Sequence, residues 1–135
     1  MTPNDLATTH ALCFTTPRPW SEAEFTDLLN SPHVRLLGDT NAFLMARCVL
    51  DETEILTLAT HPDHQRQGHA LRLLEALHTS QPGRVFLEVA ENNQAAQMLY
   101  QRAGYRTEGR RKGYYRTPDG TALDALIMVR QPATD

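Results

Sequence analysis

The pattern of the chain changes at Gln65-Arg66-Gln67-Gly68-His69-Ala70. Residues 53–60, before this stretch, are typical of a β-strand, whereas the residues after it follow the spacing of an amphipathic helix. Gln81-Pro82-Gly83 ends that helix, and residues 85–90 form a short, almost continuously apolar strand. The centre of the chain is therefore expected to be strand, helix and strand. The apolar positions that define the helix, spaced i, i+3, i+4 and i+7, are Ala70, Leu73, Leu74 and Leu77.

Further elements are predicted on both sides of this centre. Ser21 lies three residues before Glu24, the spacing of a capping box, and the helix that it opens runs to about Leu29. Gly104 is a suitable C-terminal cap for a helix over residues 92–102. Strands followed by alternating strands and helices indicate an α/β domain with a mixed sheet. The remaining expectations are a helix over residues 5–14, strands over residues 34–37, 43–50, 105–108 and 123–129, and a turn at Asp51-Glu52.

Length and composition narrow the class of protein. At 135 residues the chain is expected to be one domain, residues 1–135. A formal charge of −3 argues against a general binder of nucleic acid or of anionic membranes. No apolar stretch approaches the ~18 residues that cross a bilayer, and the first residues lack the basic and apolar parts of a signal peptide. Cys13 and Cys48 make no disulfide framework, so a cytoplasmic protein with reduced thiols is expected.

The junction between the central strand and helix has the properties of a phosphate site. A helix N-terminus carries unpaired N–H groups and the positive end of the helix dipole, so it attracts phosphate. Small residues at Gly68 and Ala70 let a pyrophosphate approach the backbone, and Arg66 can add a charged contact. One glycine before a helix is also often only a turn, and this alternative stays open.

Glu88 is an acidic residue inside an apolar strand. An ionised carboxylate in such a place is costly unless it is paired or hydrated, and it suits the work of a general base. The alternative is an edge strand whose other face meets solvent. Phe86, on the same face as Glu88, counts against that alternative.

Tyr100 shares one stripe of its predicted helix with Asn93 and Ala96. Because a second stripe of Ala95, Met98 and Leu99 is available for the core, Tyr100 is expected to face a cleft. A tyrosine has a reference pKa of ~10, so it keeps its proton at neutral pH and can donate it to a thiolate. An ordinary tyrosine at the edge of the core is the alternative.

Two other groups of reactive side chains occur in the sequence. His61, His64 and His69 are metal-ligand types, but no cysteine or carboxylate constellation accompanies them, so no metal site is expected. Neither Cys13 nor Cys48 has a recognisable histidine and carboxamide or carboxylate setting, which argues against a cysteine nucleophile.

The order and separation of these segments resemble the GNAT superfamily of N-acetyltransferases. The resemblance is strongest to the bacterial family that acetylates the N-terminal alanine of a small-subunit ribosomal protein. With Pro19-Trp20-Ser21-Glu22 upstream, the similarity covers about residues 17–130. The matching segments are Leu56-Thr57-Leu58-Ala59-Thr60-His61-Pro62, Gln65 to Ala70, Leu87-Glu88-Val89, Asn93-Gln94-Ala95-Ala96, Leu99-Tyr100, Gly104-Tyr105, Gly113-Tyr114-Tyr115 and Ile127-Met128.

The resemblance implies acetyl-CoA as cosubstrate, no metal, and a role for each matching residue. Glu88 matches the general base and Tyr100 the general acid of the family. Tyr114 and Tyr115 match the acceptor groove, although strand packing explains them equally well. The positions that match cofactor contacts are Leu58, Ala59 and Thr60 for the pantetheine arm, Gln65, Arg66, Gln67, Gly68, His69 and Ala70 for the pyrophosphate, and Asn93 for the arm.

The function that follows is transfer of acetyl to the N-terminal α-amine of a protein. A small-molecule amine as acceptor and a non-catalytic acyl-CoA-binding module are the alternatives. The expected partners are an acceptor N-terminus or a small amine, without direct nucleic-acid or membrane binding, and the chain is expected to be a monomer or a weak homodimer. The assignment needs the carboxyl group of Glu88 and the phenol of Tyr100 to converge on the thioester sulfur. Side chains on opposite faces of the sheet, or a chain that does not bind coenzyme A, would end it.

The resemblance also shows one departure from the family pattern. Family members open with a strand ahead of the first helix, whereas this chain begins almost at that helix. The first strand of the fold is therefore expected to be missing, which leaves an edge of the sheet open.

Overall fold

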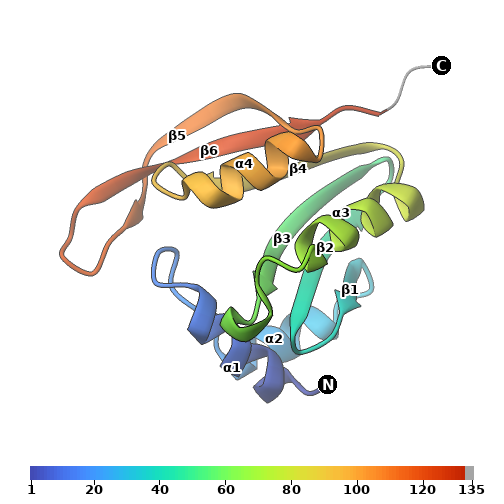
Figure 1. The fold of residues 1–135 in the computed structure, drawn as a ribbon, viewed down its shortest axis with the longest axis horizontal. Helices are drawn as coiled ribbons and strands as arrows, with labels where there is room; N and C mark the ends of the chain where they lie inside the picture. The colour runs from blue at the N-terminus through green and yellow to red at the C-terminus, as the bar shows by residue number, and fades with distance from the viewer. Residues whose placement is uncertain (133–135) are drawn as a thin grey trace.

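The computed structural model describes residues 1–132 as one sheet of six strands with helices packed against it (Figure 1). The helices are α1 (Pro3–Cys13), α2 (Glu22–Leu29), the 3₁₀ turn η1 (Pro62–His64), α3 (His69–Ser80) and α4 (Gln94–Arg102). The strands are β1 (Val34–Gly38), β2 (Ala42–Val49), β3 (Glu52–Thr60), β4 (Arg84–Ala90), β5 (Arg106–Arg116) and β6 (Ala122–Arg130).

The sheet is mixed, as the sequence predicted. Its strand order is β1-β2-β3-β4-β6-β5. Within residues 1–132, β3 and β4 form the parallel pair, and every other neighbouring pair is antiparallel. In this part of the chain no strand precedes α1, so β1 and β5 are the edge strands.

Local signals explain where the helices begin. The predicted capping box of α2 is confirmed: the Glu24 N–H donates to Ser21 Oγ at 3.2 Å, and the Ser21 N–H donates to Glu24 Oε1 at 3.1 Å. Thr2 and Asp5 form a second capping box at the start of α1. The start of α3 has no side-chain cap, because its N-cap residue is Gly68.

Two predicted boundaries are wrong. β5 extends to Arg116 rather than ending near residue 108, although almost all of its side chains are exposed. This edge strand forms because its backbone pairs with β6, so it needs no apolar pattern. Its polar sequence therefore gave no signal for a long strand. The turn between β2 and β3 falls at Leu50 and Asp51, and Glu52 already belongs to β3.

The core consists of one apolar cluster on each side of the sheet. Leu6 of α1 and Phe25 of α2 pack on one face, and Leu74 of α3 and Tyr100 of α4 pack on the other. The predicted division of α4 into two stripes is wrong, because Met98 is 62% exposed and Ala95 is exposed too. A single stripe spaced i, i+3, i+4, i+7 faces the core instead, and its members are Ala96, Leu99, Tyr100 and Ala103.

A β-bulge separates the two halves of β3. Opposite β2, Ala46 pairs with Ile55 and Met45 pairs with Thr57, so Leu56 is an extra residue in the ladder. Such a bulge bends a strand and increases its twist. The pairing of β3 with β4 ends at the same point, with Ile55 opposite Leu87. The strands lie together over Glu52–Ile55 and Arg84–Leu87, here named the closed end, and diverge over residues 56–60 and 88–90, the open end (Figure 1).

Candidate active site

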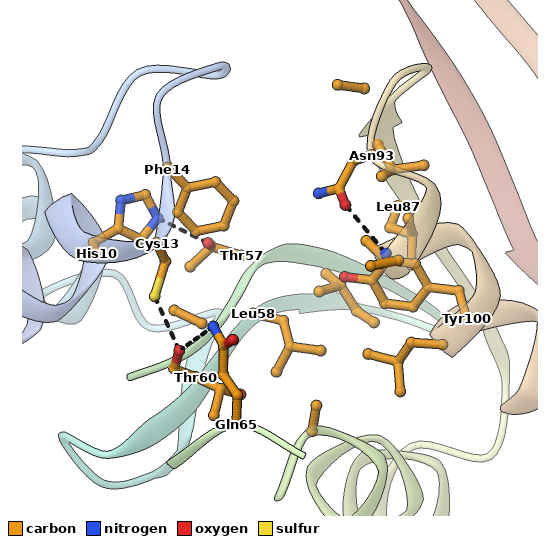
Figure 2. Close-up of a pocket in the computed structure, with 18 of the residues that line it drawn as sticks. His10, Cys13, Phe14, Thr57, Leu58, Thr60, Gln65, Leu87, Asn93 and Tyr100 are labelled. Carbon is orange, nitrogen blue, oxygen red and sulfur yellow. Dashed lines mark hydrogen bonds between the residues drawn. The ribbon is translucent and has the colours of Figure 1, made fainter. Parts of the chain in front are cut away.

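A cavity of about 800 Å³ lies between β3 and β4 at the open end. Residues of β3 and β4 line it along the divergence, and the α3 N-terminus closes one side. Figure 2 shows His10, Cys13 and Phe14 of the α1 region on one wall and Tyr100 and Asn93 on the opposite wall. The cavity therefore passes between the two strands and meets elements from both faces of the sheet.

The predicted phosphate turn borders this cavity. Gly68 has φ +80°, a conformation that glycine adopts without strain, and it leaves the first N–H groups of α3 without a side-chain cap. Arg66 also has a positive φ, of 62°. A helix N-terminus of this kind binds anions. Five residues of the predicted turn line the cavity, namely Gln65, Arg66, Gly68, His69 and Ala70.

Gln67 is the exception in the turn, because it does not line the cavity. Its Oε1 lies 3.1 Å from His69 Nε2. Arg72 donates to His69 Nδ1 at 3.1 Å, so the His69 proton resides on Nε2 and is donated to Gln67. The three side chains thus form a chain of hydrogen bonds around Gly68.

The wall predicted to meet the pantetheine arm is the end of β3. Leu58, Ala59 and Thr60 all line the cavity. Because β3 and β4 no longer pair at the open end, the backbone of these residues lacks a β4 partner. The Thr60 carbonyl oxygen accepts from Cys13 Sγ at 3.2 Å and from Gln65 Nε2 at 3.3 Å, which ties β3 to α1 and to the phosphate turn (Figure 2).

Tyr100 places its hydroxyl in the cavity (Figure 2). The residue is 8% exposed, and burial, followed by the nearby Tyr115, raises its pKa. The phenol therefore stays protonated at neutral pH. Because the hydroxyl faces the cavity, its proton can be donated to a bound molecule.

Glu88 lines the same cavity. β4 lies between β3 and β6, so the edge-strand alternative for Glu88 is wrong. The cost of a carboxylate in an apolar strand is reduced by pairing: Arg111 Nη1 donates to Glu88 Oε1 at 2.8 Å. The Glu88 side chain is 23% exposed and the Arg111 side chain is 50% exposed.

Glu88 and Tyr100 reach the cavity from opposite faces of the sheet. Leu87 and Val89 belong to the cluster that contains Tyr100, and side chains alternate along a strand, so Glu88 points to the other face. The prediction that both side chains lie on one face is therefore wrong. The criterion that opposite faces end the assignment is wrong too, because the sheet is open between β3 and β4 at this level and both side chains line one cavity.

Asn93 and the tyrosine pair occupy different parts of the site. Asn93 lines the cavity and caps α4, with its Oδ1 accepting from the Ala96 N–H at 3.1 Å. Tyr115 lines the cavity, and burial followed by Glu88 raises its pKa to about 12. Tyr114 is not among the lining residues; it is 50% exposed, and the Arg111 guanidinium stacks over its ring at 4.3 Å.

Sequence reasoning missed the wall that α1 supplies. His10 is 1% exposed; its Nδ1 accepts from the Trp20 N–H at 3.0 Å, so its Nε2 carries the proton and donates to Thr57 Oγ1 at 2.9 Å. Burial lowers the pKa of His10 to about 4, so the ring is neutral at pH 7. Phe14 and Pro17 line the same wall. No motif in α1 indicated this, because its residues meet the site only through tertiary packing.

The histidines near the phosphate turn lie close together. The ring centroids of His61 and His64 are 5.8 Å apart, and those of His64 and His69 are 6.3 Å apart. Among residues 1–132, however, no group of three or more histidine, cysteine, aspartate or glutamate side chains is arranged to hold a metal ion. The same residues contain no helix long and apolar enough to cross a membrane.

Comparison with known proteins identifies the family. Residues 33–107 match the family model described as an acetyltransferase (GNAT) domain. The chain belongs to the GNAT acetyltransferase family. It is 36% identical over 122 residues, 82% of each chain, to the [Ribosomal protein bS18]-alanine N-acetyltransferase of Haemophilus ducreyi.

Solved structures agree with this GNAT assignment. The Escherichia coli ribosomal-protein-S18-alanine N-acetyltransferase has a TM-score of 0.86 and 29% identity, covering 98% of this chain and 89% of that one. Arabidopsis thaliana NAA60 in complex with acetyl-CoA has a TM-score of 0.78 at 21% identity, covers 96% of this chain and 94% of that one, and shows the shared fold. The chain is thus an N-acetyltransferase with acetyl-CoA as cosubstrate.

Proposed function

We propose that this GNAT enzyme acetylates the N-terminal α-amine of a protein, of the ribosomal-protein-alanine type. The observation that carries the proposal is the continuous cavity at the open end, lined by an uncapped helix N-terminus, a carboxylate and a buried phenol. The names of the relatives support the class of acceptor, since the Haemophilus ducreyi protein is named for the N-terminal alanine of a ribosomal protein.

The cofactor is proposed to lie along the open end. Its pyrophosphate meets the turn Gln65–Ala70, where the N–H groups of α3 are free of a side-chain cap. The pantetheine arm follows Leu58, Ala59 and Thr60, whose backbone lacks a β4 partner, and contacts Asn93. A backbone N–H of this strand stabilises the oxyanion that forms on the thioester.

Chemistry takes place where Glu88 and Tyr100 meet the cavity. An α-amine has a reference pKa of about 7.7–8, so its deprotonation is mild. Glu88 accepts the proton of the ammonium group, directly or through a water. The free amine then attacks the thioester carbonyl carbon, the carbon–sulfur bond breaks, and Tyr100 donates its proton to the CoA thiolate. The geometry requires no covalent acetyl-enzyme.

Residues are assigned to the acceptor groove by whether they line the cavity. Tyr115 and the α1 wall line the same cavity as Glu88. Tyr114 lies outside the lining and is assigned to the outer part of the groove. We further propose one catalytic domain over residues 1–135, of which 133–135 lie outside the described residues, acting in the cytoplasm without nucleic-acid or membrane partners, as a monomer or weak homodimer.

The test is a CoA-release assay with two kinds of acceptor. We expect an alanine-initiated peptide to be acetylated faster than any member of a panel of free amines, such as polyamines, amino acids and aminoglycosides. The same peptide with a blocked N-terminus should give no CoA release. Turnover of a free amine without turnover of the peptide would reverse the acceptor class. Calorimetric binding of CoA without turnover of any amine would indicate a non-catalytic binding module.

A further inference from the structure

The contact between Glu88 and Arg111 occupies the position that the proposed chemistry needs. Arg111 lies on β5 and Glu88 on β4, with β6 between them, so the guanidinium reaches across a whole strand. Its Nη1 is 2.8 Å from Glu88 Oε1. Among the described residues, Arg111 is the ion-pair partner of Glu88. A base that must accept a proton from an amine is therefore covered by a cation.

Another carboxylate on the same face has an arginine of its own. Glu54 of β3 lies opposite Phe86 in the ladder, and Arg47 Nη1 lies 3.6 Å from its Oε1. Burial raises the pKa of Glu54 most, Arg47 opposes that change, the charge of Glu88 raises it further, and Arg111 also lowers it. By distance, Arg47 is the cation paired with Glu54 and Arg111 the cation paired with Glu88.

Several features make the Arg111 contact easy to release. Half of the Arg111 side chain is exposed, so its charge stays hydrated when it leaves Glu88. Glu88 is only 23% exposed, so it needs another cation in that place. The guanidinium also stacks on the Tyr114 ring at 4.3 Å while it pairs with Glu88, so Glu88 is not its sole contact. The β5–β6 register shifts between Arg111 and Tyr115, so the strand departs from a regular ladder there.

The ammonium group of an acceptor and the guanidinium of Arg111 carry the same charge, and either can pair with the Glu88 carboxylate. Both are cationic N–H donors, and two cations side by side on one carboxylate repel each other. An ammonium group can therefore replace the guanidinium with no net change of charge at Glu88, whereas a neutral hydroxyl group or water cannot.

We propose that Arg111 is a specificity-determining residue that holds, on Glu88, the place of the acceptor's ammonium group and is displaced by it. This inference rests on the proposed function, because it takes Glu88 as the group that meets the amine. The site opens to a cationic head group and stays closed to neutral nucleophiles. The acceptor class that it selects is an amine presented as its ammonium form.

The test measures binding of an alanine-initiated peptide to the enzyme saturated with CoA, by calorimetry. We expect Arg111→Gln to tighten binding by about three- to tenfold, the factor for a competitor that occupies roughly 70 to 90% of the sites. Arg111→Lys should lie between the variant and the wild type. The N-acetylated peptide, which has no ammonium group, should bind Arg111→Gln and wild type equally.

Two further variants distinguish competition for Glu88 from a non-specific effect of removing one positive charge. Arg116→Gln removes the same charge from β5 at a side chain that contacts the Gly120 carbonyl rather than Glu88, and it should leave peptide binding unchanged. In a Glu88→Gln background, Arg111→Gln should have no effect, because nothing remains to compete for. Thermal unfolding of each variant checks that the fold is retained.

Other results would overturn the inference. Equal tightening by Arg111→Gln and Arg116→Gln, or tightening towards the acetylated peptide, means general charge repulsion. Weaker binding by Arg111→Gln means that Arg111 contacts the acceptor itself. If the wild type acetylates a small amine instead of the peptide, the proposed acceptor is wrong while the competition is tested unchanged with that amine and its acetylated form.

Discussion

The two ends of the β3–β4 pair are built from the same strands, but one end is packed in the core and the other lines a cavity. At the closed end, Glu52–Ile55 pairs with Arg84–Leu87, and Val85 and Leu87 are buried in the core. At the open end, the ladder is interrupted and the space is a cavity lined by Glu88 and Tyr100. One extra residue in β3, Leu56, marks the change. A single bulge can thus divide a strand into a part that stabilises the fold and a part that forms a site.

The largest effect is expected from a carboxylate substitution at the open end. Glu88→Gln should lower turnover by about 10²- to 10⁴-fold, the range for loss of a general base, and leave CoA affinity unchanged. Tyr100→Phe should also lower turnover, because it removes the proton donor. CoA release measures the first quantity and calorimetry the second.

The closed end offers the matched control for this substitution. Glu52 forms a surface pair with Arg84, with Oε1 and Nη1 3.1 Å apart. Glu52→Gln removes the same charge and should leave turnover as in the wild type. Equal turnover of Glu88→Gln and the wild type would remove Glu88 from the mechanism.

A pair of glycines should separate the two ends by the property that each controls. At the closed end, a Cβ on Gly83 would lie 2.2 Å from the Asp51 carbonyl oxygen, so backbone must move. Gly83→Ala should lower the free energy of unfolding by about 1–3 kcal/mol, as overpacking does. CoA affinity should change little, because Gly83 does not line the cavity.

At the open end the expectation is reversed. A Cβ on Gly68 would meet the flexible end of Arg72 at 2.9 Å, and φ is +80°. Gly68→Ala should cost about 1 kcal/mol in stability and weaken CoA binding by at least about tenfold, equal to 1.4 kcal/mol, because its methyl group blocks phosphate. Urea unfolding and calorimetry measure the two quantities; equal losses in both variants would contradict the division.

The smallest effect concerns the α1 wall of the open end. Because the pKa of His10 is lowered to about 4, mainly by burial, the unfolded chain binds more protons than the folded chain below about pH 6.5. Stability from this group is therefore lost as the pH falls from about 6.5 towards 4. His10 should account for a loss of about 1 kcal/mol in the free energy of unfolding between pH 7 and 5.5.

One variant isolates this contribution. His10→Gln should have a smaller loss of stability between pH 7 and 5.5 than the wild type, whatever its stability at pH 7. The same slope in both proteins would mean that His10 does not titrate between the folded and unfolded states.

Much of the fold was predictable because its signals are local. The capping box of Ser21 and Glu24, the apolar spacing of α3 and the turn at Gly68 each lie within a few residues of one another. Residue patterns singled out Glu88, Tyr100 and the turn at Gly68, and resemblance to a family added the other candidate site residues. Most of them line one cavity. Gln67 and Tyr114 do not, and a linear motif cannot distinguish neighbours that point in different directions.

The sequence by itself determined the order of helices and strands along the chain, the turn at Gly68 and the family resemblance, because periodicity, capping and motif spacing act over short distances. The tertiary structure alone decided that Glu88 and Tyr100 share a cavity from opposite faces, that α1 supplies a wall through His10, and that Arg111 reaches across β6. These contacts join residues far apart in the chain, and they depend on the bulge and on strand order, for which no local pattern exists.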